Sequence, residues 1–232
     1  MSKTADMLPL WDENPTRRAP VVTVLIIVAN LGVFAYEVLL ALQGPHALDA
    51  FIRAHALVPA RLVAARGDPR EWATLFTHMF LHGGLAHVVG NCWFFWIFGD
   101  NIEDRLGSMR FALFYLLCGL GAAALQIAVD PGSTLPMLGA SGAISGVLGA
   151  YMILFPTAWV YTLVPWIVPV IPVPAFLFLA VWFVFQALNG VGSLLSGAGE
   201  AGGVAWWAHA GGFTAGVILI LWAKRTRRLR SQ

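Results

Sequence analysis

A serine between glycines begins a hydrophobic stretch in the middle of this chain. The sequence reads Leu-Gly-Ala-Ser-Gly over residues 138–142 and stays apolar to about residue 155. Gly139 allows a sharp turn into a helix, and the first N–H groups of a helix have no partner inside it. Ser141 is therefore placed as a nucleophile is, beside amides that could hold an oxyanion.

A simpler interpretation of this stretch is helix packing. Gly142, Gly146 and Gly149 form a stripe of small residues, which is how membrane helices approach one another closely. In a chain with 24 glycines, one Gly-x-Ser-Gly motif is weak evidence for chemistry. Other polar residues in apolar stretches must decide between the two interpretations.

Three such residues stand out. His87 and Asn91 are four residues apart, so they share one face of a helix. His209 lies in an Ala-His-Ala-Gly-Gly segment near the C-terminus. Polar side chains inside a bilayer cost free energy and are usually functional.

Together these residues have the chemistry of nucleophilic catalysis. Ser141 supplies the hydroxyl and His209 a general base. The sequence places no carboxylate near His209, so we expect a Ser–His dyad in which packing orients the ring. His87 and Asn91, with the backbone N–H at Ser141, are expected to donate to the oxyanion.

Composition indicates that these residues lie in a membrane. The 232 residues are 59% hydrophobic and 11% charged, whereas soluble domains carry about 25% charged residues. We expect an all-α integral membrane protein with one domain over residues 1–232. The basic tail at 224–232 is interpreted as a cytoplasmic membrane anchor and not as a nucleic-acid site.

Six apolar segments are long enough, or nearly so, to cross a bilayer. They are residues 20–42, 85–99, 111–129, 139–155, 175–188 and 204–223. Residues 44–84 mix arginines and acids with large apolar residues, which predicts short interfacial amphipathic helices. The proline-rich segment 156–174 is expected to be an interfacial or re-entrant connection, and the Gly/Ser-rich segment 189–203 a mobile loop under which water enters.

Six spans put both termini on one side. That side then holds most of the lysines and arginines, which identifies it as the cytoplasm and makes residues 1–19 a cytoplasmic segment before a six-helix core at 20–223. The second, fourth and sixth spans run inward from the outer side. His209, about six residues into its span, lies roughly 9 Å deep. Gly212 and Gly216 can pack on Gly142 and Gly146 and bring His209 to Ser141.

The motifs in this order resemble the rhomboid family of intramembrane serine proteases over nearly the whole chain. They are His87-x-x-x-Asn91, Gly139-x-Ser141-Gly142, Ala208-His209-x-x-Gly212-x-x-x-Gly216, Trp72 before His78 and His82, and Glu103-x-Arg105.

The resemblance implies a bacterial-type, six-helix protease in the inner membrane, with both termini cytoplasmic. It implies a dyad of Ser141 and His209 with acyl-enzyme chemistry, and oxyanion donors at His87 and Asn91. It also implies structural roles for Glu103 and Arg105. The expected partners are the lipid bilayer and transmembrane protein substrates, which unwind near small residues; we expect no cofactor, metal or nucleic acid.

Two positions depart from the family pattern. Ala73 stands where an arginine often follows the loop tryptophan. Ser145 stands where many members have an aromatic residue that stacks on the catalytic histidine, so the ring of His209 is expected to have less support. Ser145 itself is interpreted as a helper or packing residue.

Other functions are less compatible with the sequence. A catalytically inactive rhomboid-like scaffold that binds membrane helices would not need Ser141, His209 and Asn91 together. A transporter would need charged residues at mid-membrane, which are lacking. His78 and His82 are four apart, but no cysteine or carboxylate cluster accompanies them to make a metal site, and no His-Glu-x-x-His motif occurs.

Overall fold

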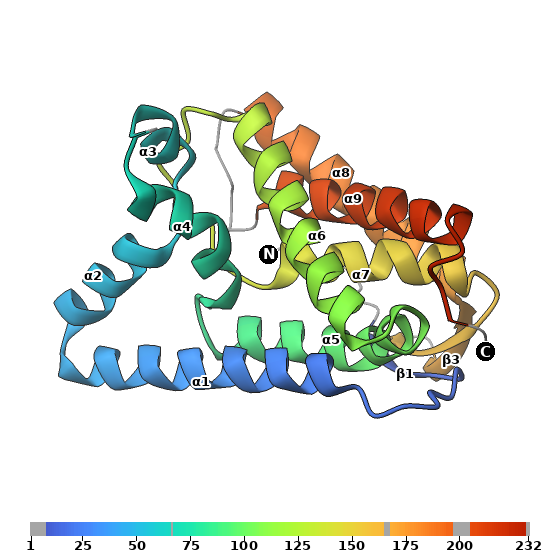
Figure 1. Cartoon of the computed structure of the whole chain (residues 1–232). Coiled ribbons are helices and arrows are strands. Elements are labelled where there is room, and N and C mark those ends of the chain that lie inside the picture. Colours follow the sequence, from blue (N-terminus) through green and yellow to red (C-terminus); the bar gives the residue numbers. More distant parts are fainter. Residues whose placement is uncertain (1–7, 66, 165–167, 197–204, 231–232) are drawn as a thin grey trace.

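The computed structural model describes residues 8–65, 67–164, 168–196 and 205–230 of a predominantly helical protein (Figure 1). Within these residues, four helices are long and apolar enough to cross a membrane: α1 (Val21–Gln43), α6 (Ser108–Val129), residues 175–192 of α8 (Ala175–Ser196), and α9 (Trp206–Arg225). Two further helices complete the bundle. They are α5 (Leu85–Leu106), whose last turns are acidic, and the shorter apolar helix α7 (Ser141–Leu154).

Two helix ends differ from the sequence expectation. Helix α5 continues to Leu106, beyond residue 99 where the second predicted span ends, and the carboxylate of Glu103 is buried and hydrogen-bonded in this extension. Helix α8 extends to Ser196, so residues 189–196 of the expected mobile loop are helical. Within them, buried Gly190 packs on Trp206 and Trp207. The rest of that loop, and residue 204 of the sixth predicted span, lie outside the described residues.

The first long connection consists of short helices, as predicted. They are α2 (Pro45–His55), α3 (Pro59–Ala64), α4 (Pro69–Thr77) and the 3-10 helix η1 (His78–Phe80). Helices α2, α3 and α4 each begin at a proline, whose fixed φ suits the first helical position. Figure 1 shows this group of helices at one end of the bundle.

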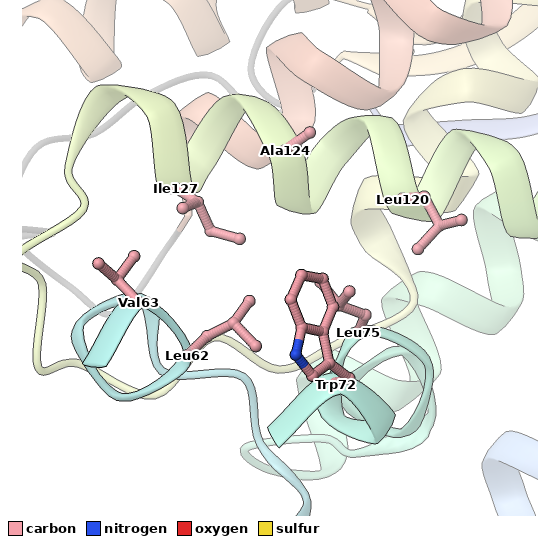
Figure 2. Close-up of a pocket in the computed structure, with 7 residues that line it drawn as sticks. All are labelled: Leu62, Val63, Trp72, Leu75, Leu120, Ala124 and Ile127. Atoms are coloured by element: carbon pink, nitrogen blue, oxygen red, sulfur yellow. The ribbon is translucent and has the colours of Figure 1, made fainter. Parts of the chain in front are cut away.

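An apolar pocket separates part of this group from helix α6 (Figure 2). Its volume is about 460 Å³. Its lining residues are Leu62, Val63, Trp72, Leu75, Leu120, Ala124 and Ile127. Because this lining holds none of the predicted reactive residues, the pocket is not the chemical site.

The proline-rich segment is a β-hairpin in a small antiparallel sheet. Strands β1 (Leu8–Asp12), β2 (Trp159–Val164) and β3 (Val168–Pro174) lie in the order β1-β2-β3. Strand β2 alternates β-branched and aromatic residues, which favours an extended backbone. The prolines of β3 are tolerated because β3 is an edge strand.

Helix α7 lies at the centre of the bundle, where it packs against α5, α6, α8 and α9. Residues Gly142 to Tyr151 are all buried. A Cβ atom on Gly212 would overlap the carbonyl oxygen of Gly142, and one on Gly216 would overlap that of Gly146. The glycine stripes predicted on the fourth and sixth spans therefore allow direct backbone contact between α7 and α9.

Candidate active site

The loop before α7 places Ser141 at the first position of the helix. Gly139 has a φ of 122°, a value that favours glycine. A Cβ atom at Gly139 would also lie 2.8 Å from two atoms of the His87 ring. The turn that leads into the serine therefore requires a glycine, both for its backbone conformation and for space.

The first connection holds this loop in place. The Gly139 N–H donates to the carbonyl of His78 at 2.9 Å. Leu57 and Met137 form a two-way backbone bridge with N···O distances of 3.1 and 2.7 Å. The position of Ser141 thus depends on residues more than 60 positions earlier in the chain.

His209 meets Ser141 directly. The Nε2 atom of His209 lies 2.8 Å from the Ser141 Oγ. Helix α9 begins at Trp206, so His209 lies in its first turn and not six residues into the helix. The Gln126 side chain of α6 accepts a hydrogen bond from the Ala208 N–H at 3.1 Å, which fixes this end of α9.

The other side of the histidine ring contacts helix α8. The Nδ1 atom of His209 lies 2.7 Å from Oε1 of Gln186. The Trp182 ring lies 5.9 Å from the imidazole centroid at 37°, and the Trp206 ring lies at 6.4 Å, edge-on. The ring is therefore supported by a polar group and two indoles, although Ser145 cannot stack on it.

The sequence analysis missed Gln186. An amide in the apolar fifth span is a polar residue of the kind that is usually functional inside a membrane. Because only a carboxylate was expected to orient the His209 ring, and none lies near it in the sequence, the ring was expected to be held by packing.

His87 and Asn91 lie on α5, which packs against α7. His87 Nδ1 accepts a hydrogen bond from the Gly83 N–H at 3.4 Å, and the ring lies against Gly139. Asn91 is buried, and its Nδ2 has no hydrogen-bond partner among the described residues. A buried amide donor without a partner costs about 1–3 kcal/mol, so a role in binding would account for it.

Ser145, Glu103 and Arg105 are engaged in the scaffold. The Ser145 hydroxyl donates to the carbonyl of Ser141 at 2.6 Å, within α7. Glu103 accepts from the N–H groups of Val22 and Thr23 at 2.9 and 2.8 Å. The Arg105 guanidinium lies 5.9 Å from the centroid of the Phe155 ring. The backbone carbonyl of Arg105 accepts a hydrogen bond from the Arg230 N–H.

His78 and His82 are used within the first connection. The His78 Nδ1–H donates to the carbonyl of Thr74 at 2.7 Å. The His82 backbone N–H donates to the buried carboxylate of Glu37. Among the described residues, no three His, Cys, Asp or Glu side chains gather as metal ligands do.

Comparisons with known proteins agree with this arrangement. A model of the rhomboid domain matches residues 69–225. Rhomboid protease GluP of Bacillus subtilis is 40% identical over 82 residues, which are 35% of this chain and 16% of that protein. Putative rhomboid protease YdcA of the same organism is 34% identical over 50% of this chain and 61% of its own length.

A longer match is to Rhomboid-like protein 11, chloroplastic, of Arabidopsis thaliana, which is 27% identical over 90% of this chain and 67% of that protein. The matched part of the chain therefore spans about a sixth of the length of GluP and about two thirds of this plant relative. The rhomboid-domain match and the helices that are long and apolar enough to cross a bilayer define an integral membrane protein. The domain match covers more than half of the chain, which belongs to the rhomboid family.

Proposed function

We propose that this chain is an intramembrane serine endopeptidase that cleaves transmembrane segments of membrane proteins, and that residues 1–232 form one such domain. The observation that carries the proposal is the 2.8 Å contact between the Ser141 hydroxyl and His209 Nε2. Relatives such as GluP are named as rhomboid proteases. A scaffold that only binds membrane helices would not need the Ser141 hydroxyl to be hydrogen-bonded to the His209 imidazole.

The chemistry runs in two halves. Ser141 Oγ attacks the scissile carbonyl carbon while its proton moves to His209 Nε2, and the carbonyl electrons become an oxyanion. The C–N bond then breaks as His209 returns the proton to the leaving nitrogen, which leaves an ester on Ser141. Water attacks this ester, its proton passes to Nε2 and then to the departing Oγ, and the free enzyme is regenerated.

The oxyanion needs preorganised donors. We assign the unpartnered Nδ2 of Asn91, the His87 ring and the free backbone N–H groups at the start of α7 to this task. The neutral ring of His87 serves as a donor through one nitrogen. Glu103 and Arg105 take structural roles away from the reacting atoms.

We place the chain in a plasma membrane with six spans and both termini in the cytoplasm, as in a bacterial inner membrane. Strand β1 pairs with β2, and the Arg230 N–H bonds to the carbonyl of Arg105. Strand β1, the backbone of Arg230 and the connections at 106–108 and 156–164 therefore lie at one end of the bundle. An even number of spans places both termini on the same side of the membrane in this way.

Proteoliposomes that contain the purified protein and a panel of tagged single-span substrates test the function. We expect wild-type protein to cleave at least one substrate within its transmembrane segment, and Ser141→Ala and His209→Ala to cleave none. Cleavage by Ser141→Ala equal to that by wild type would overturn the proposal. Substrate binding without cleavage by any protein would favour the scaffold.

A further inference from the structure

The described residues place an amide on the far side of the catalytic imidazole, where serine proteases of the triad type have a carboxylate. Gln186 is on α8, and its Oε1 lies 2.7 Å from His209 Nδ1. Ser141 Oγ lies 2.8 Å from the other ring nitrogen. The three side chains form a continuous hydrogen-bonded line across α7, α9 and α8.

We propose that Gln186 is the positioning residue of the dyad and sets the tautomer of His209. An amide oxygen has no hydrogen to donate, so Nδ1 must carry the hydrogen in this bond. A neutral imidazole has only one N–H group. Nε2 is therefore left with its lone pair toward Ser141, which is the state a general base requires. This inference rests on the proposed function.

The same contact persists through the reaction. When His209 takes the serine proton, its Nδ1–H remains on Gln186 Oε1, and the amide dipole stabilises the imidazolium. A carboxylate in this position would leave a buried negative charge beside a neutral ring between turnovers, which is costly when unpaired. A neutral amide avoids that cost but stabilises the cation less.

Helix α8 contributes a second contact from the same face. Trp182 and Gln186 are four residues apart, so both project from one side of α8. The Trp182 ring packs 5.9 Å from the imidazole centroid. This pair supplies the support that Ser145 on α7 cannot give, and it makes the orientation of the base depend on α8.

A matched set of variants tests the proposal. Gln186→Met keeps the size of the side chain but removes the acceptor, and Gln186→Glu keeps an oxygen acceptor. Asn189→Leu is the control on the same helix, because exposed Asn189 bonds only to the carbonyl of Phe185 among the described contacts. Wild type and Ser141→Ala set the limits of activity.

The kinetic readout is cleavage of a membrane substrate. We expect Gln186→Met to lower kcat about 10- to 100-fold with KM within about twofold, since general-base catalysis contributes about 10²–10⁴-fold. Gln186→Glu should lose less kcat than Gln186→Met, because its oxygen still accepts the hydrogen of Nδ1. Asn189→Leu should keep kcat within about threefold of wild type. Equal loss in Gln186→Met and Gln186→Glu, or no loss in Gln186→Met, would overturn the proposal.

A second readout does not depend on activity. Spectra of protein with ¹⁵N-labelled histidine, assigned by comparison with His209→Gln, report which ring nitrogen of His209 carries hydrogen. We expect hydrogen on Nδ1 in wild type and a mixture or the Nε2 tautomer in Gln186→Met. The Nε2 tautomer in wild type would contradict the proposal. An inactive wild type with hydrogen on Nδ1 that depends on Gln186 would reject the protease function and leave the positioning role intact.

Discussion

Asn91 is a polar residue whose cost to the fold is visible. It is buried on α5, and its Nδ2 donor has no partner among the described residues. Removal of such an unpaired donor would stabilise the folded protein. The donor is therefore useful only if it binds a group that is absent from the free protein. We propose that this partner is an oxyanion that exists only during the reaction.

Replacement of Asn91 tests this role. We expect Asn91→Ala to lower kcat by about 10²–10³-fold, as loss of one oxyanion donor does, while the melting temperature stays the same or rises. Steady-state kinetics on a membrane substrate measure the first effect. Asn30→Ala is the matched control, because Asn30 on α1 is also buried and its Nδ2 has no hydrogen-bond acceptor among the described residues. Its activity should stay within about threefold of wild type.

At the scale of helices, α7 and α9 depend on a backbone contact. Gly212 of α9 lies against the carbonyl of Gly142, one residue after the serine. A methyl group on Gly212 must push the helices apart, and the Ser141–His209 contact lies a single turn away. The geometry of the dyad therefore depends on the close approach of α7 and α9, which the glycines at 142 and 212 allow.

We expect Gly212→Ala to reduce the rate of substrate cleavage about 100-fold, because a displacement of about 1 Å can cost that much. Cleavage assays in proteoliposomes measure it. Gly32→Ala on α1 serves as control, because a Cβ atom there would meet nothing within 4 Å. If Gly212→Ala cleaves as fast as Gly32→Ala, close helix approach does not set the geometry.

The N-terminus of helix α1 is capped by the Glu103 carboxylate of helix α5. Glu103 accepts bonds from the Val22 and Thr23 N–H groups and from the hydroxyls of Thr23 and Ser108. A negative charge at a helix N-terminus is stabilising, and these donors would be unpaired without it. Glu103 thus connects α1 to α5.

We expect Glu103→Ala to lower the free energy of unfolding by about 3 kcal/mol, from the bonds to a charged group and the unpaired donors. Unfolding in detergent micelles measures the change. Asp104→Ala is the control, since Asp104 makes a single exposed contact among the described residues, at 3.5 Å with the Arg17 N–H. A similar small loss in both variants would show that the buried carboxylate is not a structural anchor.

The sequence predicted the helices and the meeting of Ser141 with His209, because long apolar runs and small-residue stripes are local signals. It did not predict the tertiary partners. Gln186 meets His209 and Glu37 meets the His82 backbone through contacts between distant segments. Strand β2 was missed because its partner, β1, lies about 150 residues earlier and because the prolines suggested irregular structure.

At the scale of the whole molecule, the first connection supports the active-site loop. His78 is buried in η1, and its carbonyl holds Gly139. Burial lowers the pKa of His78 from 6.5 to about 4. In the unfolded chain this histidine takes a proton near pH 6.5, whereas in the folded protein it stays neutral. The contribution of neutral His78 to the free energy of unfolding is therefore fully present above pH 6.5 and is lost as the pH falls toward 4.

We expect the melting temperature of the wild type to fall between pH 7 and pH 4.5, and the fall to be smaller in His78→Gln, which cannot titrate. The loss in free energy for one such group approaches about 3 kcal/mol at the acid end. Thermal unfolding across this pH range measures it. His46→Gln in the exposed part of α2 is the control and should keep the wild-type slope. Parallel curves for wild type and His78→Gln would rule out His78 as the source.

We propose that Ser141 is a nucleophile made reactive by His209. Labelling with a fluorophosphonate in detergent, followed by mass spectrometry of the modified peptide, tests it without any assumption about the substrate. We expect a covalent adduct on Ser141 in wild type, none in Ser141→Ala and a labelling rate at least about 100-fold lower in His209→Ala. An unlabelled wild type, or equal labelling in Ser141→Ala, would contradict it.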